Sequence, residues 1–456
     1  METKENTLGT EQVGKLMVKF AVPSIIAMLV GALYNIVDQF FIGQAVGTDG
    51  NAATNIAFPL STMCISLSLM FGVGGASCYN LSLGEGDREK APFYIGNSFV
   101  MLGASGLLLC LITELLLTPM LIFFGSPDRI LPYAQEYVGI TAFGFPFLIL
   151  ATGGGHLIRA DGSPGMTMFC NIIGAVVNTG LDALFVFGFN WGMSGAAAAT
   201  IIGQVVSALI VAWYVFFRFK SSKLTKEHFI PAAKHITRIV SIGLASFFNQ
   251  ISMMIVQIVV NNELKYYGSL SEYGDSIPLA AAGIIMKVNH IVFSFVIGLG
   301  QGSQPIESFN YGARKYDRVR KALLMASAAS IMIASVALAT FQIMPREILS
   351  MFGTGSEEYF TFGEKFFRIF LLCLPIVSIQ PVASTFFTSI GKPIKGILLS
   401  LTRQILFFLP LIVILPLFMG IEGILYSGPA ADTLSGITTI IMVLLEFRAM
   451  KKLAES

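Results

Sequence analysis

Long apolar stretches dominate this chain, and short polar stretches separate them. A helix that crosses a bilayer needs roughly 20 consecutive apolar residues, and apolar segments of about this length or more recur along the whole chain. They run over residues 14–43, 52–82, 92–123, 130–157, 164–189, 194–219, 235–266, 277–309, 317–343, 358–389, 394–419 and 423–449. Several are long enough that we expect tilt or extension beyond the bilayer. The pattern predicts an all-α integral membrane protein with twelve transmembrane helices.

The composition supports a membrane environment. Hydrophobic residues make up 54% of the 456 residues and charged residues only 12%, whereas soluble proteins carry about 25% charged residues. Such a chain cannot cover itself with polar surface in water, which excludes a cytosolic enzyme, a secreted disulfide scaffold and a free nucleic-acid-binding protein. The five cysteines lie in apolar stretches without a C-x-x-C pair, so we expect them to be packing residues.

The lysines and arginines predict the orientation in the membrane. If the N-terminus is cytoplasmic, 22 of the 29 basic residues fall on the cytoplasmic side. Only Arg129, Lys265 and Arg346 fall outside, and four others lie within spans. Because basic residues accumulate in cytoplasmic loops, both termini are predicted to be cytoplasmic. The basic run from Arg314 to Lys321 is then a cytoplasmic loop near anionic lipid, and it needs no nucleic acid to explain it.

The two halves of the chain resemble one another. The polar stretch 220–234 divides the chain into a first lobe (1–219, helices one to six) and a second lobe (235–456, helices seven to twelve). At an offset of 226 residues, Gly72, Gly74, Ser77, Gly86 and Arg88 match Gly298, Gly300, Ser303, Gly312 and Arg314. A six-helix repeat enters the membrane from the same side twice, so it predicts two pseudo-symmetric lobes around a central cavity.

Two acids lie deep within predicted spans, Asp38 in the first helix and Asp182 in the fifth. An acid at this depth costs about 2.5–3.5 kcal/mol on insertion scales, and it indicates function by default. Counting residues from the outer turns places Asp182 and Thr200 at a similar depth, and Asn178 precedes Asp182 by one helical turn. These oxygen ligands suit a small hard cation or a shared proton. The alternative is that the two acids are paired with hydroxyls or amides for packing alone.

The second lobe has no comparable acid pair. Glu307 is expected at a cytoplasmic helix end, and Asp432 could be either a partner in a helix kink or a functional group. His156, His228 and His235 show no metal spacing and are expected to be solvated or at helix ends. Polar residues expected to line the substrate cavity are Asn35, Asn289 and Gln301.

Three stretches carry a family resemblance. They are AVPSIIAMLVGALYNIVDQFFIG (21–43), RADGSPGMTMFCNIIGAVVNTGLDALFVFGFNWGMSGAAAAT (159–200) and QPIESFNYGARK (304–315). With them, nearly the whole chain resembles the multidrug and toxic compound extrusion (MATE) family of antiporters. The resemblance implies twelve helices in two lobes around a central cavity. It also implies that Asp38, Asn178, Asp182 and Thr200 are the cation-coupling residues of the first lobe.

The resemblance further implies a secondary active exporter that is not an enzyme. Small organic compounds, often cationic, would leave by alternating access against inward sodium or protons. We expect no cofactor other than a possible sodium ion, no nucleic-acid partner, a monomer, and a location in the plasma membrane among its lipids. The alternative function is a flippase for a lipid-linked oligosaccharide or peptidoglycan precursor. A large anionic head group would want several basic cavity residues, and only Lys287 and Arg403 are obvious candidates.

Overall fold

The first half of the chain folds into helices with short connections. The computed structural model describes residues 7–274, 276–351 and 356–455, so Lys4, one of the residues counted above as cytoplasmic, lies outside the described residues. The helices are α1 (Thr7–Thr10), α2 (Val13–Val46), α3 (Thr48–Gly84), α4 (Ala91–Leu115), α5 (Leu117–Phe123), α6 (Leu131–Thr141), η1 (Ala142–Gly144), α7 (Phe145–Ala160), α8 (Pro164–Asp182), η2 (Ala183–Gly188) and α9 (Gly192–Phe217).

The second half repeats this arrangement. A short helical turn in the connecting stretch, η3 (Lys226–Phe229), leads into it. The helices that follow are α10 (Ala233–Ser269), α11 (Ser276–Gly312), α12 (Tyr316–Ile343), α13 (Pro345–Ser350), α14 (Glu357–Phe370), α15 (Leu374–Val377), α16 (Ile379–Ser389), α17 (Pro393–Leu401), η4 (Thr402–Phe408), α18 (Leu409–Met419) and α19 (Ile421–Glu455).

The predicted transmembrane helices are confirmed. Among the described residues, 11 helices are long and apolar enough to cross a membrane. A twelfth span consists of α14 together with Leu374–Ser389, and it is bent by 51° at the break. The fourth and tenth spans are both interrupted, at η1 and at this bend. Pro146 and Pro375 lie in the first turn of the helices that follow the two breaks, as expected for a residue whose ring favours that position.

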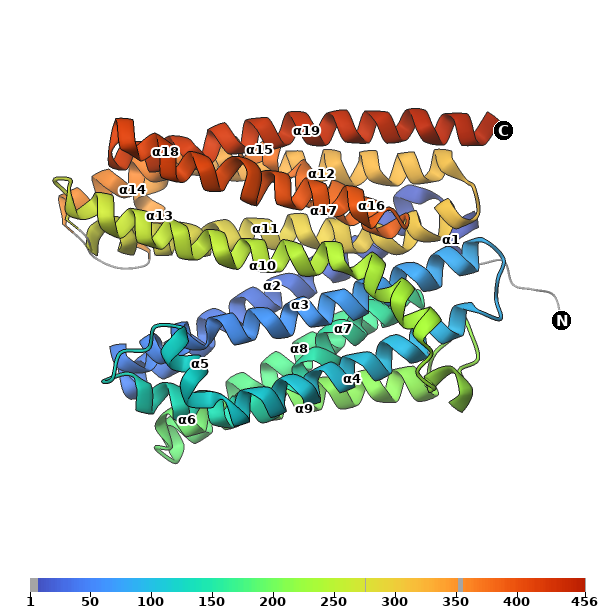
Figure 1. Cartoon of the computed structure of the whole chain (residues 1–456), viewed down its shortest axis with the longest axis horizontal. Coiled ribbons are helices and arrows are strands. Elements are labelled where there is room, and N and C mark those ends of the chain that lie inside the picture. The colour runs from blue at the N-terminus through green and yellow to red at the C-terminus, as the bar shows by residue number, and fades with distance from the viewer. Residues whose placement is uncertain (1–6, 275, 352–355, 456) are drawn as a thin grey trace.

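The helices form two bundles lying side by side. Figure 1 shows α3 to α9 in the lower bundle and α10 to α19 in the upper one. One buried apolar cluster lies entirely within residues 42–242, and a second within 260–431. A third cluster joins the start of α2, including Leu16 and Phe20, to α11, α12 and α16 of the second half. The first transmembrane helix therefore packs against both bundles.

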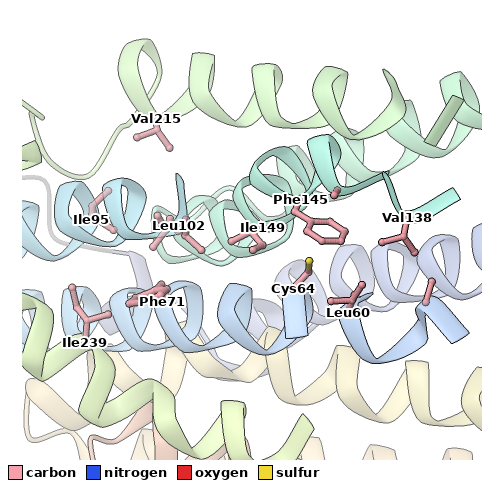
Figure 2. Packing of buried hydrophobic residues seen from close by; sticks show 14 of the residues in the cluster. Leu60, Cys64, Phe71, Ile95, Leu102, Val138, Phe145, Ile149, Val215 and Ile239 are labelled. Carbon is pink, nitrogen blue, oxygen red and sulfur yellow. The ribbon is translucent and has the colours of Figure 1, made fainter. Parts of the chain in front are cut away.

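Close packing in the first bundle explains its apolar composition. Figure 2 shows Leu60, Cys64 and Phe71 of α3 packed against residues of α4 and α7, among them Leu102 and Ile149. The five cysteines are free thiols; Cys64, Cys78 and Cys170 pack within buried apolar clusters, as expected, and Cys110 and Cys373 are half-buried.

Glycines allow the two bundles to approach closely. A Cβ atom on Gly243 of α10 would overlap the carbonyl oxygen of Met70 on α3. On the symmetry-related side, a Cβ on Gly298 of α11 would lie 2.6 Å from the Cα of Ile25 on α2. Only glycine permits these backbone contacts. Gly243 and Gly298 therefore belong to the interface between the lobes.

Candidate functional site

The two membrane-depth acids lie in one buried cluster. Asp38 is on α2, Asn178 and Asp182 are on α8, and Thr200 is on α9. All four side chains are buried, and Asp182 has no exposed surface. The residue spacing that placed Asn178 and Asp182 on one face of a helix holds in the structure, because α8 is regular as far as Asp182.

Thr200 connects the helices of this cluster. Its hydroxyl donates to Oδ1 of Asp38 at 3.5 Å and accepts from Nδ2 of Asn178 at 3.4 Å. The hydroxyl of Tyr34 also donates to it at 3.5 Å. These contacts are long, as expected of a loosely closed ring of polar groups. Three different transmembrane helices thus meet at one hydroxyl group.

Several oxygen atoms in the cluster have no partner. Both carboxylate oxygens of Asp182 and the amide oxygen of Asn178 are buried without a hydrogen bond. The charges of Asp38 and Asp182 lie close enough to interact. Within the described part of the chain, no lysine or arginine forms an ion pair with either acid; the ion pairs involve other carboxylates. A buried polar group without a partner is unfavourable, so the arrangement fits a site that takes up a positive species.

The ligand set favours a proton or a hard monovalent cation. Two carboxylates, one amide oxygen and one hydroxyl are oxygen donors of the kind that hard cations prefer. These four oxygen donors differ from the thiolate and imidazole ligands typical of structural zinc sites.

Two tyrosines complete the cluster, and the sequence analysis missed both. Tyr34 precedes Asp38 by one helical turn, so the spacing alone could have indicated it. Tyr137 lies on α6, and its phenol is close enough to interact electrostatically with Asp38 and Asp182. No sequence signal links Tyr137 to the site, because only packing brings α6 against α3 and α9.

A π-helical turn begins directly after Asp182. The segment η2 covers Ala183–Gly188. A π turn inserts an additional residue into the helix and is often found at functional sites. The depth count in the sequence assumed a regular helix, and it did not predict this irregularity.

The three predicted cavity residues lie outside the hydrogen-bonded cluster. Asn35 is exposed, and its side-chain amide donates to the carbonyl of Gly31 at 2.9 Å. Asn289 and Gln301 on α11 are half-buried, and the amide oxygen of Asn289 is buried without a partner. Their assignment to a substrate cavity stays a prediction.

The structure shows the partner of Asp432, and a role in function stays a prediction. Its Oδ1 lies 2.9 Å from an Nη atom of Arg403, which belongs to the π-helical segment η4. Asp432 is therefore one half of a buried ion pair between the last two spans. Glu307 corrects an expectation, because it is fully buried inside α11 and accepts a hydrogen bond from Ser389 at 2.9 Å. The helix continues to Gly312, so Glu307 is not at its end.

Two basic residues also depart from the expectations. His156 is buried rather than solvated, and its Nδ1 lies 2.8 Å from an Nη atom of Arg159. Arg159, one of the 22 basic residues predicted on the cytoplasmic side, lies in the last turn of α7 and is buried rather than exposed. Both side chains are enclosed because α7 packs against α3, α4 and α9.

Comparisons with known proteins agree with this architecture. The family model described as MatE matches residues 23–184 and 268–414. The multidrug export protein MepA of Staphylococcus aureus (strain MSSA476) is 24% identical over 440 residues, which covers 94% of this chain and 93% of that protein. MepA of Staphylococcus haemolyticus (strain JCSC1435) is 22% identical over 429 residues, with the same coverage.

Solved structures share the fold. A multidrug resistance MATE family transporter of the MOP superfamily in an outward-facing conformation superposes with a TM-score of 0.91 at 21% identity, over 99% of this chain and 100% of that chain. A MOP superfamily transporter from Pyrococcus furiosus, described as having a binding pocket of reverse polarity that suggests a different function, also gives 0.91 at 21% identity, over 99% of both chains. One fold thus accommodates binding pockets of different polarity.

Proposed function

Because the chain belongs to the MatE family of multidrug and toxic compound extrusion transporters, we propose that it exports small organic compounds by antiport against inward sodium ions or protons. The observation that carries this proposal is the buried pair Asp38 and Asp182, with both oxygens of Asp182 unpartnered. The names of the MepA relatives, which are multidrug export proteins, support the substrate class. The polar residues Asn35, Asn289 and Gln301 would line the path of the substrate.

The coupling step follows from the charge of the cluster. A cation or proton that enters from outside would neutralise buried negative charge shared by α2, α8 and α9. Each inward charge supplies about 2.3 kcal/mol per 100 mV of membrane potential. A ligand shifts a conformational equilibrium only by its different affinity for the two states. Because Asp38 lies on α2, which packs against both bundles, binding here would favour one cavity opening over the other.

The same proposal includes the location of the protein and its orientation in the membrane. The protein would lie in the plasma membrane as a monomer with both termini in the cytoplasm, which places the lysine- and arginine-rich loops inside. The coupling cation would then enter from the side opposite to those loops. No cofactor other than the transported cation is needed by this mechanism.

The flippase alternative finds less support in the structure. A lipid-linked precursor carries an anionic head group, which would need free basic groups in the cavity. Arg403 is already paired with Asp432. Lys287 is therefore the one of these two basic candidates that has no carboxylate within ion-pair distance in the described structure.

Reconstitution of the purified full chain tests the proposal. Proteoliposomes loaded with ethidium, an organic cation, would be given a sodium gradient or a proton gradient separately. We expect ethidium exchange to follow one of the two gradients. Asp182→Asn should abolish that exchange, whereas the matched control Asp128→Asn in an exposed outer loop should not. Transport by Asp182→Asn at the wild-type rate, with the gradient intact, would show that the cluster does not couple.

A further inference from the structure

A cavity outside the acid cluster opens between α2, α8 and α9, near the predicted cytoplasmic ends of these helices. Its volume is about 550 Å³. Lys19 and Pro23 of α2 line one wall of the cavity, and residues 162–166 line a second. The third wall consists of Trp213 and Arg218 at the end of α9, together with Lys220. None of these residues belongs to the cation cluster or to the predicted substrate-cavity residues Asn35, Asn289 and Gln301.

All charged side chains that line the cavity are basic. Lys19, Arg218 and Lys220 line it, and no acidic residue does. Lys220 Nζ donates to the hydroxyl of Ser163 at 3.0 Å, and the guanidinium of Arg218 lies 5.3 Å from the centre of the Trp213 ring. Lys19 makes only a long contact with Glu11, at 3.9 Å. Three basic side chains therefore line the same cavity and are candidates to bind one anionic group.

Asp161, which directly precedes the wall formed by residues 162–166, already has hydrogen-bond partners. Asp161 accepts hydrogen bonds from the backbone N–H groups of Lys220 and Ser221, and from the hydroxyl of Tyr214 at 2.7 Å. Its carboxylate anchors the chain behind the wall and does not line the cavity. It therefore does not fill the site from within.

The polarity of the cavity changes with depth. Arg218 and Lys220 lie at and beyond the end of α9, whereas Trp213 lies five residues further into the helix. On α2, Pro23 likewise lies one turn deeper than Lys19. With a rise of 1.5 Å per residue, the cations would lie at the head-group level and the apolar groups at the start of the hydrocarbon. Trp213 is 44% exposed, as expected of a residue that faces lipid at the membrane interface.

We propose that this cavity binds one anionic phospholipid of the leaflet on that side, with its phosphate held by Lys19, Arg218 and Lys220 and its acyl chains against Pro23, Met166 and Trp213. Basic pockets between transmembrane helices are known to recognise such head groups. The start of α8 adds a favourable field, because helix N-termini attract anions and Ser163 makes no side-chain cap there. The bound lipid would contact α2, the helix that also carries Asp38.

Fluorescence of Trp213 tests the proposal directly. The chain has 2 tryptophans, so Trp191→Phe leaves Trp213 as the single reporter. The full-length protein is reconstituted into vesicles that contain increasing fractions of brominated phosphatidylglycerol or brominated phosphatidylcholine, since bromine quenches a nearby indole. We expect phosphatidylglycerol to quench at a lower fraction than phosphatidylcholine. Each cation should contribute roughly a fivefold preference.

Charge variants identify the cavity as the source of the preference. The triple substitution Lys19→Gln, Arg218→Gln and Lys220→Gln should make the two quenching curves coincide. Lys19→Gln alone should lower the preference by roughly fivefold, and this exposed side chain can be replaced without disturbing the fold. The matched control Lys451→Gln with Lys452→Gln, at the exposed end of α19, should keep the preference.

Three results would overturn the proposal. The first is equal quenching by the two lipids in the parent protein. The second is an unchanged preference in both the single and the triple charge variants, which would assign it to the general field of the basic loops. The third is displacement of the anionic lipid by millimolar inorganic phosphate, which would show that the cavity takes a small free anion. Transport plays no part in these measurements, so they are independent of the proposed export.

Discussion

The hydroxyl of Thr200 lies 3.5 Å from Oδ1 of Asp38, although 162 positions separate the two residues in the chain. The same hydroxyl accepts hydrogen bonds from Asn178 and Tyr34. One small side chain on α9 thus holds together the polar groups of α2 and α8. The two acids can act on one ion only if this connection keeps their helices in register.

Removing this hydroxyl should weaken binding of the coupling cation. Thr200→Ala removes the group that donates to Asp38 and leaves Asn178 with one partner fewer. Leaving a buried polar group without its hydrogen bond costs about 1–3 kcal/mol, so we expect the half-saturating cation concentration in proteoliposome transport to rise roughly 5- to 140-fold. Thr200→Ser keeps the hydroxyl and should remain close to wild type. If alanine and serine behave alike, the hydroxyl does not organise the site.

Asp182 should destabilise the protein while it supports transport. Its carboxylate is buried without a hydrogen bond, and an unpaired buried charge is costly. At alkaline pH without sodium, Asp182→Asn should therefore melt at a higher temperature than wild type. The coupling ion should raise the melting temperature of the wild type, because a ligand that binds only the folded state stabilises it, but not that of the variant. Sodium titration at fixed pH and pH titration without sodium would be measured separately, and a wild type that responds to neither would contradict the site.

The losses of stability caused by substituting Arg403 and Asp432 should not add, because the two side chains form one ion pair. Arg403→Gln leaves the buried carboxylate of Asp432 alone, and breaking such a pair costs about 3 kcal/mol or more. Asp432→Asn should cost less, because the side chain of Arg403 is 21% exposed and that of Asp432 only 8%. The double variant should be more stable than the sum of the single losses indicates. Thermal melting of all four proteins gives the coupling, and simple additivity would show that the pair is not formed in the membrane.

Contact between the lobes should be sensitive to a single methyl group. Gly243→Ala places a Cβ against the carbonyl oxygen of Met70 across the interface of α10 and α3. Overpacking of this kind costs about 1–3 kcal/mol, so the variant should favour a conformation in which these helices separate. Accessibility of a cysteine introduced nearby to a thiol reagent would report that shift.

A second glycine supplies the control. Gly283 on α11 has open space around the position of an added Cβ, with no heavy atom within 4 Å. Gly283→Ala should therefore leave both accessibility and transport near the wild-type level. Equal behaviour of the two alanine variants would exclude the close contact at Gly243 as a determinant of conformation.

Much of this architecture is predictable from the chain alone. Continuous apolar runs of bilayer length define twelve spans, because a helix in lipid must satisfy its own backbone groups. The membrane-depth acids were identifiable because few acids occur at that depth and because helical rise converts residue counts into distance. Asn178 followed from Asp182 by helical spacing. The coupling roles of these residues stay predictions until transport is measured.

The remaining features depend on which helix faces meet, and no local pattern encodes that. Tyr137 joins the cluster only because α6 packs beside it, and Arg403 neutralises Asp432 only because the last two spans are neighbours. Burial of His156 and Arg159 likewise comes from the helices around α7. The sequence by itself determined the number, length and depth of the helices, which follow from local hydrophobicity and spacing. The tertiary structure decided the partners of each polar side chain, because these contacts join residues that are distant in the chain.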